Sequence, residues 1–422
     1  MGGYALLLRR KYLPDTASPC NKGLYKGAVF WLAYPIGTRN KHTFPPLRHA
    51  MKRNMTRIRV QTEGGKGYDI LVGCNTLEDL GPAIKRLGLG DSIFLITSPR
   101  IAKFHLKAVR KGLRGSGCRN ISVHYVPDGE RYKNKSSYDR LLNELLSFGR
   151  GDEKKVFVVN LGGGVVGDLG GFVAATYKRG INYVQIPSTL LALVDCGIGG
   201  KVGINFNGAK NIIGAFHQPA LVYADFSLLK TLSKRELRSG LAEVVKYGVI
   251  ESPGLFDFVE RNTDKIFALD NAVIRRIVTE SYSIKADIVE RDEFDEKGIR
   301  ARLNFGHTIG HAIESASRYA YRHGESVAIG MVCANDIAVA LGRLTHGDAA
   351  RVENLLVKIG LPVRMKNHNL QEILKFFWRD KKFVGGKNRF ILASQIGKTS
   401  IVDGVPMGII KRAIRNRFTS TR

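Results

Sequence analysis

From Thr56 onward, short apolar runs alternate along the chain with segments in which apolar residues recur at helical spacing. The apolar runs predict buried strands, and the amphipathic segments predict helices. The predicted strands are 57–61, 69–72, 92–97, 121–126 and 155–161, and the predicted helices are 77–87, a segment ending at Arg114, and 138–148. We expect the first two strands to form an entry hairpin. Strands that alternate with helices indicate a parallel sheet with both faces covered.

Beyond residue 226 the pattern changes to longer amphipathic segments. The helices predicted there are 236–250, 271–291, 303–319, 325–341 and 349–359. The second half of the chain is therefore predicted to be mostly helical. We place the boundary near 225–229, which divides the folded part into an α/β domain over 55–228 and a helical domain over 229–422.

Residues 1–54 follow neither pattern. They hold ten Lys and Arg residues, a single acid, Asp15, and five prolines, without an amphipathic period. We interpret this segment as a disordered basic extension or as the product of a start site placed too far upstream. A transit peptide is a weaker interpretation, because such peptides are rich in serine and this segment contains only Ser18.

Composition narrows the class of protein. The five cysteines are scattered and form no CxxC pair, which fits a reducing compartment and argues against a disulfide scaffold. No apolar run approaches the roughly 20 residues needed to cross a bilayer. We therefore expect a cytoplasmic protein without membrane association. An organellar location would require 1–54 to be a transit peptide.

The net charge of +29 is the compositional outlier. Strongly basic chains often bind nucleic acids. Here the cations are spread along the whole chain, without an arginine-rich arm with interleaved aromatic residues. We expect no specific nucleic-acid partner, and the charge equally suits an anionic small substrate.

A glycine-rich stretch, 162–171, directly follows the predicted strand 155–161 and precedes an apolar helix pattern. Glycines after a strand let the backbone approach a ligand, and the N-terminus of the next helix attracts phosphate. The stretch reads GGGVVGDLGG, which is not GxGxxG, so a tight turn between a strand and a helix remains an alternative. A carboxylate would repel a phosphate, so we expect Asp168 to contact a ribose hydroxyl or a nicotinamide instead.

A second group of polar residues lies in the predicted helices. Glu243 and Lys246 are three residues apart, so both face one side of a helix whose other neighbours are apolar. His307 and His311 are four apart, and the predicted helix places Arg300 and Asn304 on the same face. Two histidines at this spacing could both bind a metal. The segment HTIGH lacks the glutamate of the zinc-protease motif HExxH, which argues against a protease.

Long motifs resemble the 3-dehydroquinate synthase family, in the family's order, over residues 55 to 400 or nearly so. They are 127–133, 162–205, 209–219, 240–248, 300–314, 323–331 and 379–392. The resemblance implies a Rossmann-like N-terminal domain, a mostly α-helical C-terminal domain, and an active site between them. It also implies a homodimer that needs NAD and a divalent metal, zinc or cobalt. The implied reaction, in the shikimate pathway of aromatic amino acid biosynthesis, converts an anionic sugar phosphate, 3-deoxy-D-arabino-heptulosonate 7-phosphate, to 3-dehydroquinate and phosphate.

The resemblance also implies roles for individual residues. The metal ligands are Glu243, His307 and His323. The residues at the substrate are Asp195, Lys201, Asn211, Lys246, Lys285, Arg300, Asn304, His311, Lys381 or Lys382, and Arg179 from a neighbouring subunit. The residues at NAD are Asp128, Gly129, Glu130, Lys133, Gly163, Gly164, Val165, Gly167, Asp168, Ser188, Thr189, Lys201, Lys210, Leu228 and Thr231.

The chain departs from the family pattern at a few positions. Cys196 and Gly197 stand where the family has two serines, and Thr97 and Ser98 where an Asp or Asn often contacts ribose. Substrate choice therefore stays open between 3-dehydroquinate synthase and another sugar phosphate cyclase, such as an aminodehydroquinate or valiolone-forming enzyme. A metal-dependent polyol dehydrogenase and a basic nucleic-acid-binding protein are further alternatives.

Overall fold

The computed structural model describes residues 55–422 except 64, 66, 151–154, 208, 367–368, 379–382, 385–386 and 420–422. All of them belong to one compact unit, Thr43–Arg422. The predictions made for residues 1–54, for Lys381 and for Lys382 lie outside the described residues. Within the described part of the chain, no helix is both long enough and apolar enough to cross a bilayer.

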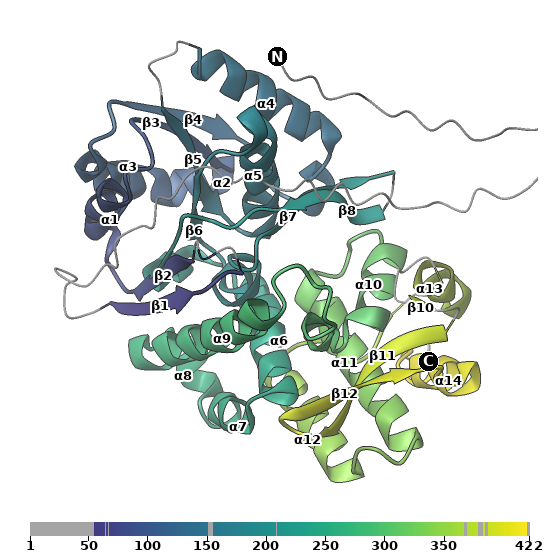
Figure 1. Cartoon of the computed structure of the whole chain (residues 1–422). Helices are drawn as coiled ribbons and strands as arrows, with labels where there is room; N and C mark the ends of the chain where they lie inside the picture. The colour runs from purple at the N-terminus through teal and green to yellow at the C-terminus, as the bar shows by residue number, and fades with distance from the viewer. Residues whose placement is uncertain are drawn as a thin grey trace, which may run out of the picture. The chain divides into compact units, whose positions relative to one another are not determined.

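A seven-stranded sheet forms the N-terminal half (Figure 1). Its strands are β1 (Thr56–Val60), β2 (Tyr68–Gly73), β3 (Ser92–Thr97), β4 (Asn120–Tyr125), β5 (Val156–Gly162), β6 (Tyr183–Pro187) and β9 (Leu221–Asp225). Their spatial order is β1-β2-β9-β6-β5-β3-β4. The pair β1–β2 is antiparallel and all other neighbours are parallel. The predicted hairpin and parallel sheet are thus confirmed, whereas β6 and β9 were not predicted.

Helices cover both faces of this sheet, because side chains alternate between the faces along each strand. In β3, Ile93 and Leu95 belong to the core formed with α1 (Leu80–Leu87) and α3 (Lys107–Leu113). The intervening Phe94 and Ile96 belong to the core formed with α4 (Lys135–Phe148) and α5 (Gly164–Thr176). A short helix α2 (Pro99–Ile101) and a π-helical turn, η2 (Ala102–Leu106), lead into α3. This double burial explains why the strands appear in the sequence as continuous apolar runs.

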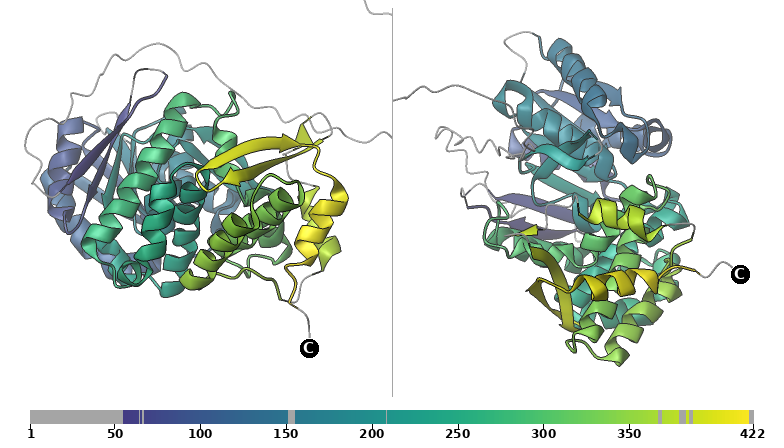
Figure 2. Two further views of the ribbon diagram at one scale, coloured as in Figure 1. Left: turned by 90° about the horizontal axis from the view of Figure 1, so that it is seen from below. Right: turned by 90° about the vertical axis from the view of Figure 1, so that its right-hand side faces the viewer.

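The C-terminal half is mostly helical (Figures 1 and 2). Its helices are α6 (Lys234–Ile250), α7 (Pro253–Arg261), α8 (Thr263–Phe267), α9 (Asn271–Arg291), α10 (His307–Ala316), α11 (His323–Ala340), α12 (His346–Ile359), α13 (Leu370–Phe377) and α14 (Met407–Arg415). A hairpin that the sequence did not predict, β11 (Lys387–Gln395) with β12 (Lys398–Asp403), lies against α11 and α6, and β10 (Phe383–Val384) pairs with β11. Helix α6 is mostly buried and packs against α7, α9, α11 and α12.

A separate two-stranded hairpin lies between β6 and β9 in the chain. Strands β7 (Lys201–Phe206) and β8 (Ala209–Phe216) pair antiparallel, and β7 packs against α5 (Figure 1). The alternation of small, polar and apolar residues in this segment did not predict strands. The hairpin carries three of the predicted site residues: Lys201, Lys210 and Asn211.

The predicted helix 303–319 is wrong at its beginning. Arg300–Asn304 forms a separate 3-10 turn, η8, and Phe305 and Gly306 form a turn after it. Gly306 then adopts a left-handed conformation with φ +76°, and α10 begins only at His307. A Cβ on Gly306 would lie 2.5 Å from Met331 Cγ, so close packing against α11 requires glycine here. Arg300 and Asn304 therefore do not share a helix face with His307, contrary to the prediction.

Candidate active site

Three helices bring Glu243, His307 and His323 together. Glu243 lies in the middle of α6, His307 is the first residue of α10, and His323 is the first residue of α11. Two glycines of α11 make this possible, because a Cβ at Gly324 would lie 1.9 Å from Ser239 O of α6, and one at Gly330 would lie 2.0 Å from Gly306 O. The backbones thus approach closely enough for the three side chains to meet.

The arrangement of these side chains suits a divalent cation. The three donor atoms lie within 4.8 Å of one another. Nε2 of His307 and Nε2 of His323 are each 3.6 Å from Glu243 Oε1, which is too far for a hydrogen bond. Two ligand atoms about 2.1 Å from a tetrahedral cation lie about 3.4 Å from each other, so the spacing matches shared coordination. Glu243 is fully buried, and neither of its oxygens accepts a hydrogen bond of good geometry, although Lys246 faces Oε2.

Hydrogen bonds on the opposite side of each imidazole orient the two histidines. His307 Nδ1 lies 3.0 Å from Phe305 O, and His323 Nδ1 lies 3.3 Å from Glu314 Oε2. Both partners are acceptors, so Nδ1 of each ring carries a proton and Nε2 is the nitrogen that faces the site. Burial lowers the pKa of His323, but Glu243 and Glu314 outweigh it and raise that pKa to about 9. Two imidazoles and one carboxylate are a donor set suited to zinc or cobalt.

His311 lies one turn after His307 on α10. Its ring centroid is 5.2 Å from that of His307 and 6.0 Å from that of His323. The structure therefore places His311 beside His307, as the i, i+4 spacing predicted, and near His323.

A second cluster surrounds Asp195, which lies in the π-helical turn η6 (Ala192–Cys196) after β6. Lys285 Nζ donates to Asp195 Oδ1 at 2.8 Å and to its carbonyl oxygen at 2.7 Å, and Tyr247 donates to Oδ1 at 2.6 Å. Lys246 Nζ is 4.0 Å from the same oxygen and pairs with Glu243. Burial raises the pKa of Asp195, but the ammonium groups of Lys285 and Lys246 outweigh it and hold that pKa well below its usual range. Lys246 thus joins this cluster to the candidate metal ligands.

Two further cations lie near Phe216, the last residue of β8. Arg300 is buried and donates to Glu293 O at 2.7 Å and to Gly199 O at 3.3 Å. Lys201 Nζ lies 2.5 Å from Asp295 Oδ2. The charged groups of Arg300 and Lys201 are both within 6 Å of the Phe216 ring centroid, at 5.9 and 5.8 Å. Burial and then the charge of Arg300 lower the pKa of Lys201.

The residues predicted at NAD follow the carboxyl ends of parallel strands, except Lys201 and Lys210, which lie in the β7–β8 hairpin. Asp128–Lys133 come after β4, Gly163–Asp168 after β5, and Ser188 and Thr189 after β6; Leu228 and Thr231 lie in η7 (Phe226–Thr231) after β9. Parallel strands end at one edge of the sheet, so these segments are brought together. From β3 the chain adds β4 at one edge of the sheet, whereas from β5 it adds β6 on the opposite side. The position between β3 and β5 is therefore a topological switch point. Open α/β sheets bind ligands at such points.

The glycine-rich stretch is mainly a packing device. Helix α5 begins at Gly164, so most of these glycines lie inside a helix and not in a turn. A Cβ at Gly170 would lie 1.9 Å from Asn160 Oδ1, and one at Gly167 would lie 2.7 Å from Gln185 Nε2. The expected free turn is therefore limited to Gly163, because Gly162 is the last residue of β5, and the glycines within α5 let this helix sit directly on β5 and β6.

A network of charges lies near this edge. Lys133 Nζ is 2.7 Å from Asp168 Oδ2 and 3.6 Å from Glu130 Oε1. Lys210, from β8, is 3.7 Å from the same Glu130 oxygen and 2.7 Å from Glu314 Oε1. Burial raises the pKa of Asp168, although the charge of Lys133 opposes it. Lys210 therefore lies between the predicted NAD segment and the partner of His323.

For the side chains of three of the predicted substrate residues, the described residues provide no polar partner that would indicate a role. Asn211 is exposed with φ +50°, Asn304 ends η8 half-buried, and Arg179 is exposed with φ +65° in the turn after α5. Within the described part of the chain, none of these three side chains forms a hydrogen bond or an ion pair.

Two residues predicted at NAD do have polar partners. The Ser98 hydroxyl donates to Asp128 Oδ1 at 2.7 Å, and Thr231 Oγ1 is 2.7 Å from His105 Nε2.

Sequence reasoning missed several residues that the structure places in contact with the predicted ones, among them Tyr247 and Glu314. Tyr247 follows Lys246 directly and donates to Asp195, and Glu314 contacts His323. A signal existed for Glu314, which stands seven residues after His307 in an otherwise apolar part of α10, on the same face. For Tyr247 there was no such signal, because an aromatic residue in an apolar helix is ordinarily part of the core.

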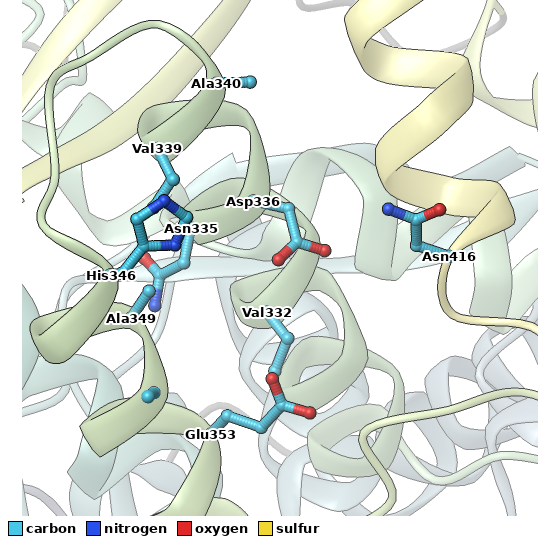
Figure 3. A pocket seen from close by; sticks show the side chains of 10 residues that line it. Val332, Asn335, Asp336, Val339, Ala340, His346, Ala349, Glu353 and Asn416 are labelled. Atoms are coloured by element: carbon cyan, nitrogen blue, oxygen red, sulfur yellow. The ribbon is translucent and has the colours of Figure 1, made fainter.

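A pocket of about 480 Å³ lies among α11, α12 and the end of α14 and is lined by none of the predicted residues (Figure 3). Its carboxylates, Asp336 and Glu353, are held by Arg417 at 2.6 and 2.7 Å. Because both acids already have a cationic partner, we assign no ligand to this pocket.

Known proteins resemble the chain over most of its length. A family profile described as 3-dehydroquinate synthase N-terminal matches residues 123–239, and one described as 3-dehydroquinate synthase C-terminal matches residues 240–383. A 3-dehydroquinate synthase from Nostoc punctiforme is 44% identical over 354 residues, which are 83% of this chain and 96% of that protein. One from Rippkaea orientalis is 43% identical over 352 residues, 82% of this chain and 94% of that protein.

Solved structures share the fold at lower identity. A 2-epi-5-epi-valiolone synthase from Streptomyces hygroscopicus subsp. jinggangensis, with NAD⁺ and Zn²⁺ bound, is 24% identical with a TM-score of 0.76, covering 83% of this chain and 96% of that chain. A 2-deoxy-scyllo-inosose synthase with NAD⁺ and Co²⁺ is 24% identical with a TM-score of 0.77, covering 86% of this chain and 100% of that chain. An iron-containing alcohol dehydrogenase reaches a TM-score of 0.58 at 16% identity, covering 85% of this chain and 97% of that chain.

Proposed function

The chain belongs to the 3-dehydroquinate synthase family, and we propose that it catalyses this family's reaction. The substrate is 3-deoxy-D-arabino-heptulosonate 7-phosphate, and the products are 3-dehydroquinate and phosphate. The observation that carries the proposal is the buried carboxylate of Glu243, with an oxygen 3.6 Å from two imidazole nitrogens, in a chain that spans 96% of a named synthase. The enzyme is a carbon–oxygen lyase that acts on a phosphate ester.

The reaction requires NAD and a divalent metal, and Glu243, His307 and His323 would hold the metal. When bound, zinc or cobalt polarises substrate oxygens, and the dinucleotide supplies a transient oxidation of a substrate hydroxyl. Support comes from the donor set of this chain and from the two solved cyclases, which carry NAD⁺ with Zn²⁺ or Co²⁺. The dinucleotide would lie at the switch point between β3 and β5, against the N-terminus of α5.

The cations of this chain suit an anionic substrate. We assign Lys285 and Arg300 to the substrate carboxylate, because guanidinium and ammonium groups in a desolvated site bind a carboxylate strongly. Lys246 and Asp195 would orient hydroxyl groups next to the metal ligands. Lys201, Asn211, Asn304, His311 and Lys381 or Lys382 are assigned to the phosphate end and the remaining hydroxyls, and Arg179 to the site of a second subunit in a homodimer.

The side chains mainly bind, orient and exclude water. In the sequence of steps a hydroxyl is oxidised, phosphate is eliminated, the carbonyl is reduced, and the ring opens and closes by aldol addition. A substrate phosphate oxygen can take the proton during elimination, so no protein nucleophile is required. Positioning of this kind can account for a large part of a rate enhancement. Location in the cytoplasm and dimerisation remain predictions.

Two alternatives use the same fold. An aminodehydroquinate synthase would act on an amino substrate with the same carboxylate. A valiolone-type cyclase acts on a sugar phosphate without a carboxylate and would not need the Lys285 and Arg300 pair.

Phosphate release tests the proposal. The full chain is incubated with the heptulosonate phosphate, NAD and Zn²⁺ or Co²⁺, phosphate is quantified, and the organic product is identified by mass spectrometry. We expect 3-dehydroquinate, and we expect loss of turnover after chelation with recovery on adding either metal. Sedoheptulose 7-phosphate, which lacks the carboxylate, is the matched control. Faster turnover of that control would assign the enzyme to the valiolone-type branch and refute the proposal.

A further inference from the structure

Glu314 divides its two carboxylate oxygens between two partners. It lies on α10, seven residues after His307, and is 4% exposed. Oε2 is 3.3 Å from His323 Nδ1, while Oε1 is 2.7 Å from Lys210 Nζ. A carboxylate buried only to neutralise Lys210 would not need its second oxygen against the imidazole of a candidate metal ligand.

Lys210 is itself held from the other side. Its ammonium group lies 3.7 Å from Glu130 Oε1 and 5.6 Å from the centroid of the Tyr319 ring. Asn205 Nδ2 donates to the same Glu130 oxygen at 2.9 Å. The position of Lys210, and through it that of Glu314, is therefore determined by groups from the β7–β8 hairpin, from the segment after β4 and from α10.

We propose that Glu314 is a positioning residue for the metal site, and that Lys210 holds Glu314 in the orientation this role requires. The inference rests on the proposed metal at Glu243, His307 and His323. A carboxylate that accepts the Nδ1 proton of a histidine keeps the ring in one tautomer and one rotation, with Nε2 directed to the metal, and makes Nε2 a better donor. His323 is the ligand that depends on this contact, because Phe305 O performs the equivalent role for His307.

The fold itself restrains the side chain of His323 only weakly. His323 is the first residue of α11, where intrahelical hydrogen bonds have only begun to restrain the chain. Its ring is partly accessible, whereas Glu243 is fully buried. Without Glu314 the imidazole could rotate about its side-chain bonds, and each metal-binding event would have to restrict that freedom.

Cobalt binding tests this inference without substrate or NAD. Full-length apoprotein is titrated with Co²⁺, and the dissociation constant and the visible absorption bands of bound Co²⁺ are recorded for the wild type and for Glu314→Ala, Glu314→Gln and Lys210→Met. The matched control is Glu251→Gln, the same chemical change at an exposed carboxylate at the end of α6 that pairs with Arg302. His323→Ala provides the value for loss of a ligand.

We expect Glu314→Ala to weaken Co²⁺ binding about 10- to 100-fold and to shift the absorption bands, as is typical for loss of a hydrogen-bond partner behind a metal ligand. Glu314→Gln retains an acceptor for Nδ1 and should fall between Ala and wild type. Lys210→Met should weaken binding several-fold, and the control should match the wild type. Circular dichroism identifies any variant that fails to fold, in which case Glu314→Gln and Lys210→Met decide.

Wild-type dissociation constants and spectra in both Glu314→Gln and Lys210→Met, or in a folded Glu314→Ala, would overturn the inference. Unchanged Co²⁺ binding in His323→Ala would overturn the ligand assignment itself, and with it the proposed metal centre. The two proposals can fail separately. If the wild type releases no phosphate, but the Glu314 variants bind Co²⁺ more weakly than the wild type, the proposed reaction is contradicted and the positioning role of Glu314 stands.

Discussion

Replacing Glu243 by glutamine is the most direct perturbation of the candidate metal centre. The substitution keeps the volume and shape of a fully buried side chain and removes only its charge. A metal that binds the folded protein alone stabilises it by RT ln(1 + [M]/Kd), which is about 2.7 kcal/mol at a metal concentration 100 times Kd. If the loss of the carboxylate weakens binding 100-fold, the same concentration equals the new Kd, and the gain falls to about 0.4 kcal/mol.

Urea unfolding of the apoprotein with and without Co²⁺, followed by circular dichroism, measures this gain for the wild type and for Glu243→Gln. Each protein serves as its own reference, so any cost of leaving Lys246 with only Asp195, at 4.0 Å, cancels in the difference. Glu251→Gln at the end of the same helix should behave as the wild type, because its side chain is exposed. A gain of about 2.7 kcal/mol in the Glu243→Gln protein would refute the assignment of this carboxylate as a ligand.

Three further outcomes follow from the structure. Gly170→Ala should lower the free energy of unfolding by about 1–3 kcal/mol, because the added Cβ would lie 1.9 Å from Asn160 Oδ1, and unchanged stability in urea would contradict the packing role of this glycine. The pKa of Asp195 in the folded protein lies below 3.8, the ordinary value of an aspartate, so its contribution to stability is present above pH 3.8 and is lost as the pH falls. Between pH 5 and pH 3 the wild type should therefore lose about 1 kcal/mol of unfolding free energy that Asp195→Asn does not lose. Acid unfolding curves of equal slope for the two proteins would show that the carboxylate is not ionised below its usual range. Arg300→Ala should reduce phosphate release from the heptulosonate phosphate at least about tenfold, a change of roughly 1.4 kcal/mol, while keeping the bound metal. It should also lower the melting temperature, since Arg300 donates to Glu293 O and Gly199 O, and full activity would remove it from the site.

Much of the fold could be predicted because burial leaves a direct trace in the sequence. Strand β3 is buried on both faces and therefore appears as the unbroken apolar run Ser92–Thr97. Helices α6 and α9 have the length and period that distinguish them from strands. Strands β6 and β9 were missed because each is short and buried throughout, so neither shows the alternation of β1, and periodicity does not separate so short a run from a helix segment.

The sequence by itself determined the residue types of the candidate metal centre. Glu243 stands in an apolar helix, and His307 and His323 stand in motifs that resemble a known family, so these ligands could be identified before their distances were known. What it could not determine was the path of the chain before His307. A periodic pattern continues through Gly306, but this residue is left-handed and its contact with Met331 leaves no room for a Cβ, and that contact exists only once α10 packs against α11.

Only the tertiary structure decided the surroundings of these ligands. Glu314 acquires its role because α11 brings His323 to one of its oxygens and β8 brings Lys210 to the other. Likewise Tyr247 becomes a partner of Asp195 only because η6 lies against α6. Sequence spacing encodes which residues share a face of one element, whereas hydrogen bonds between elements depend on which faces meet when the chain folds.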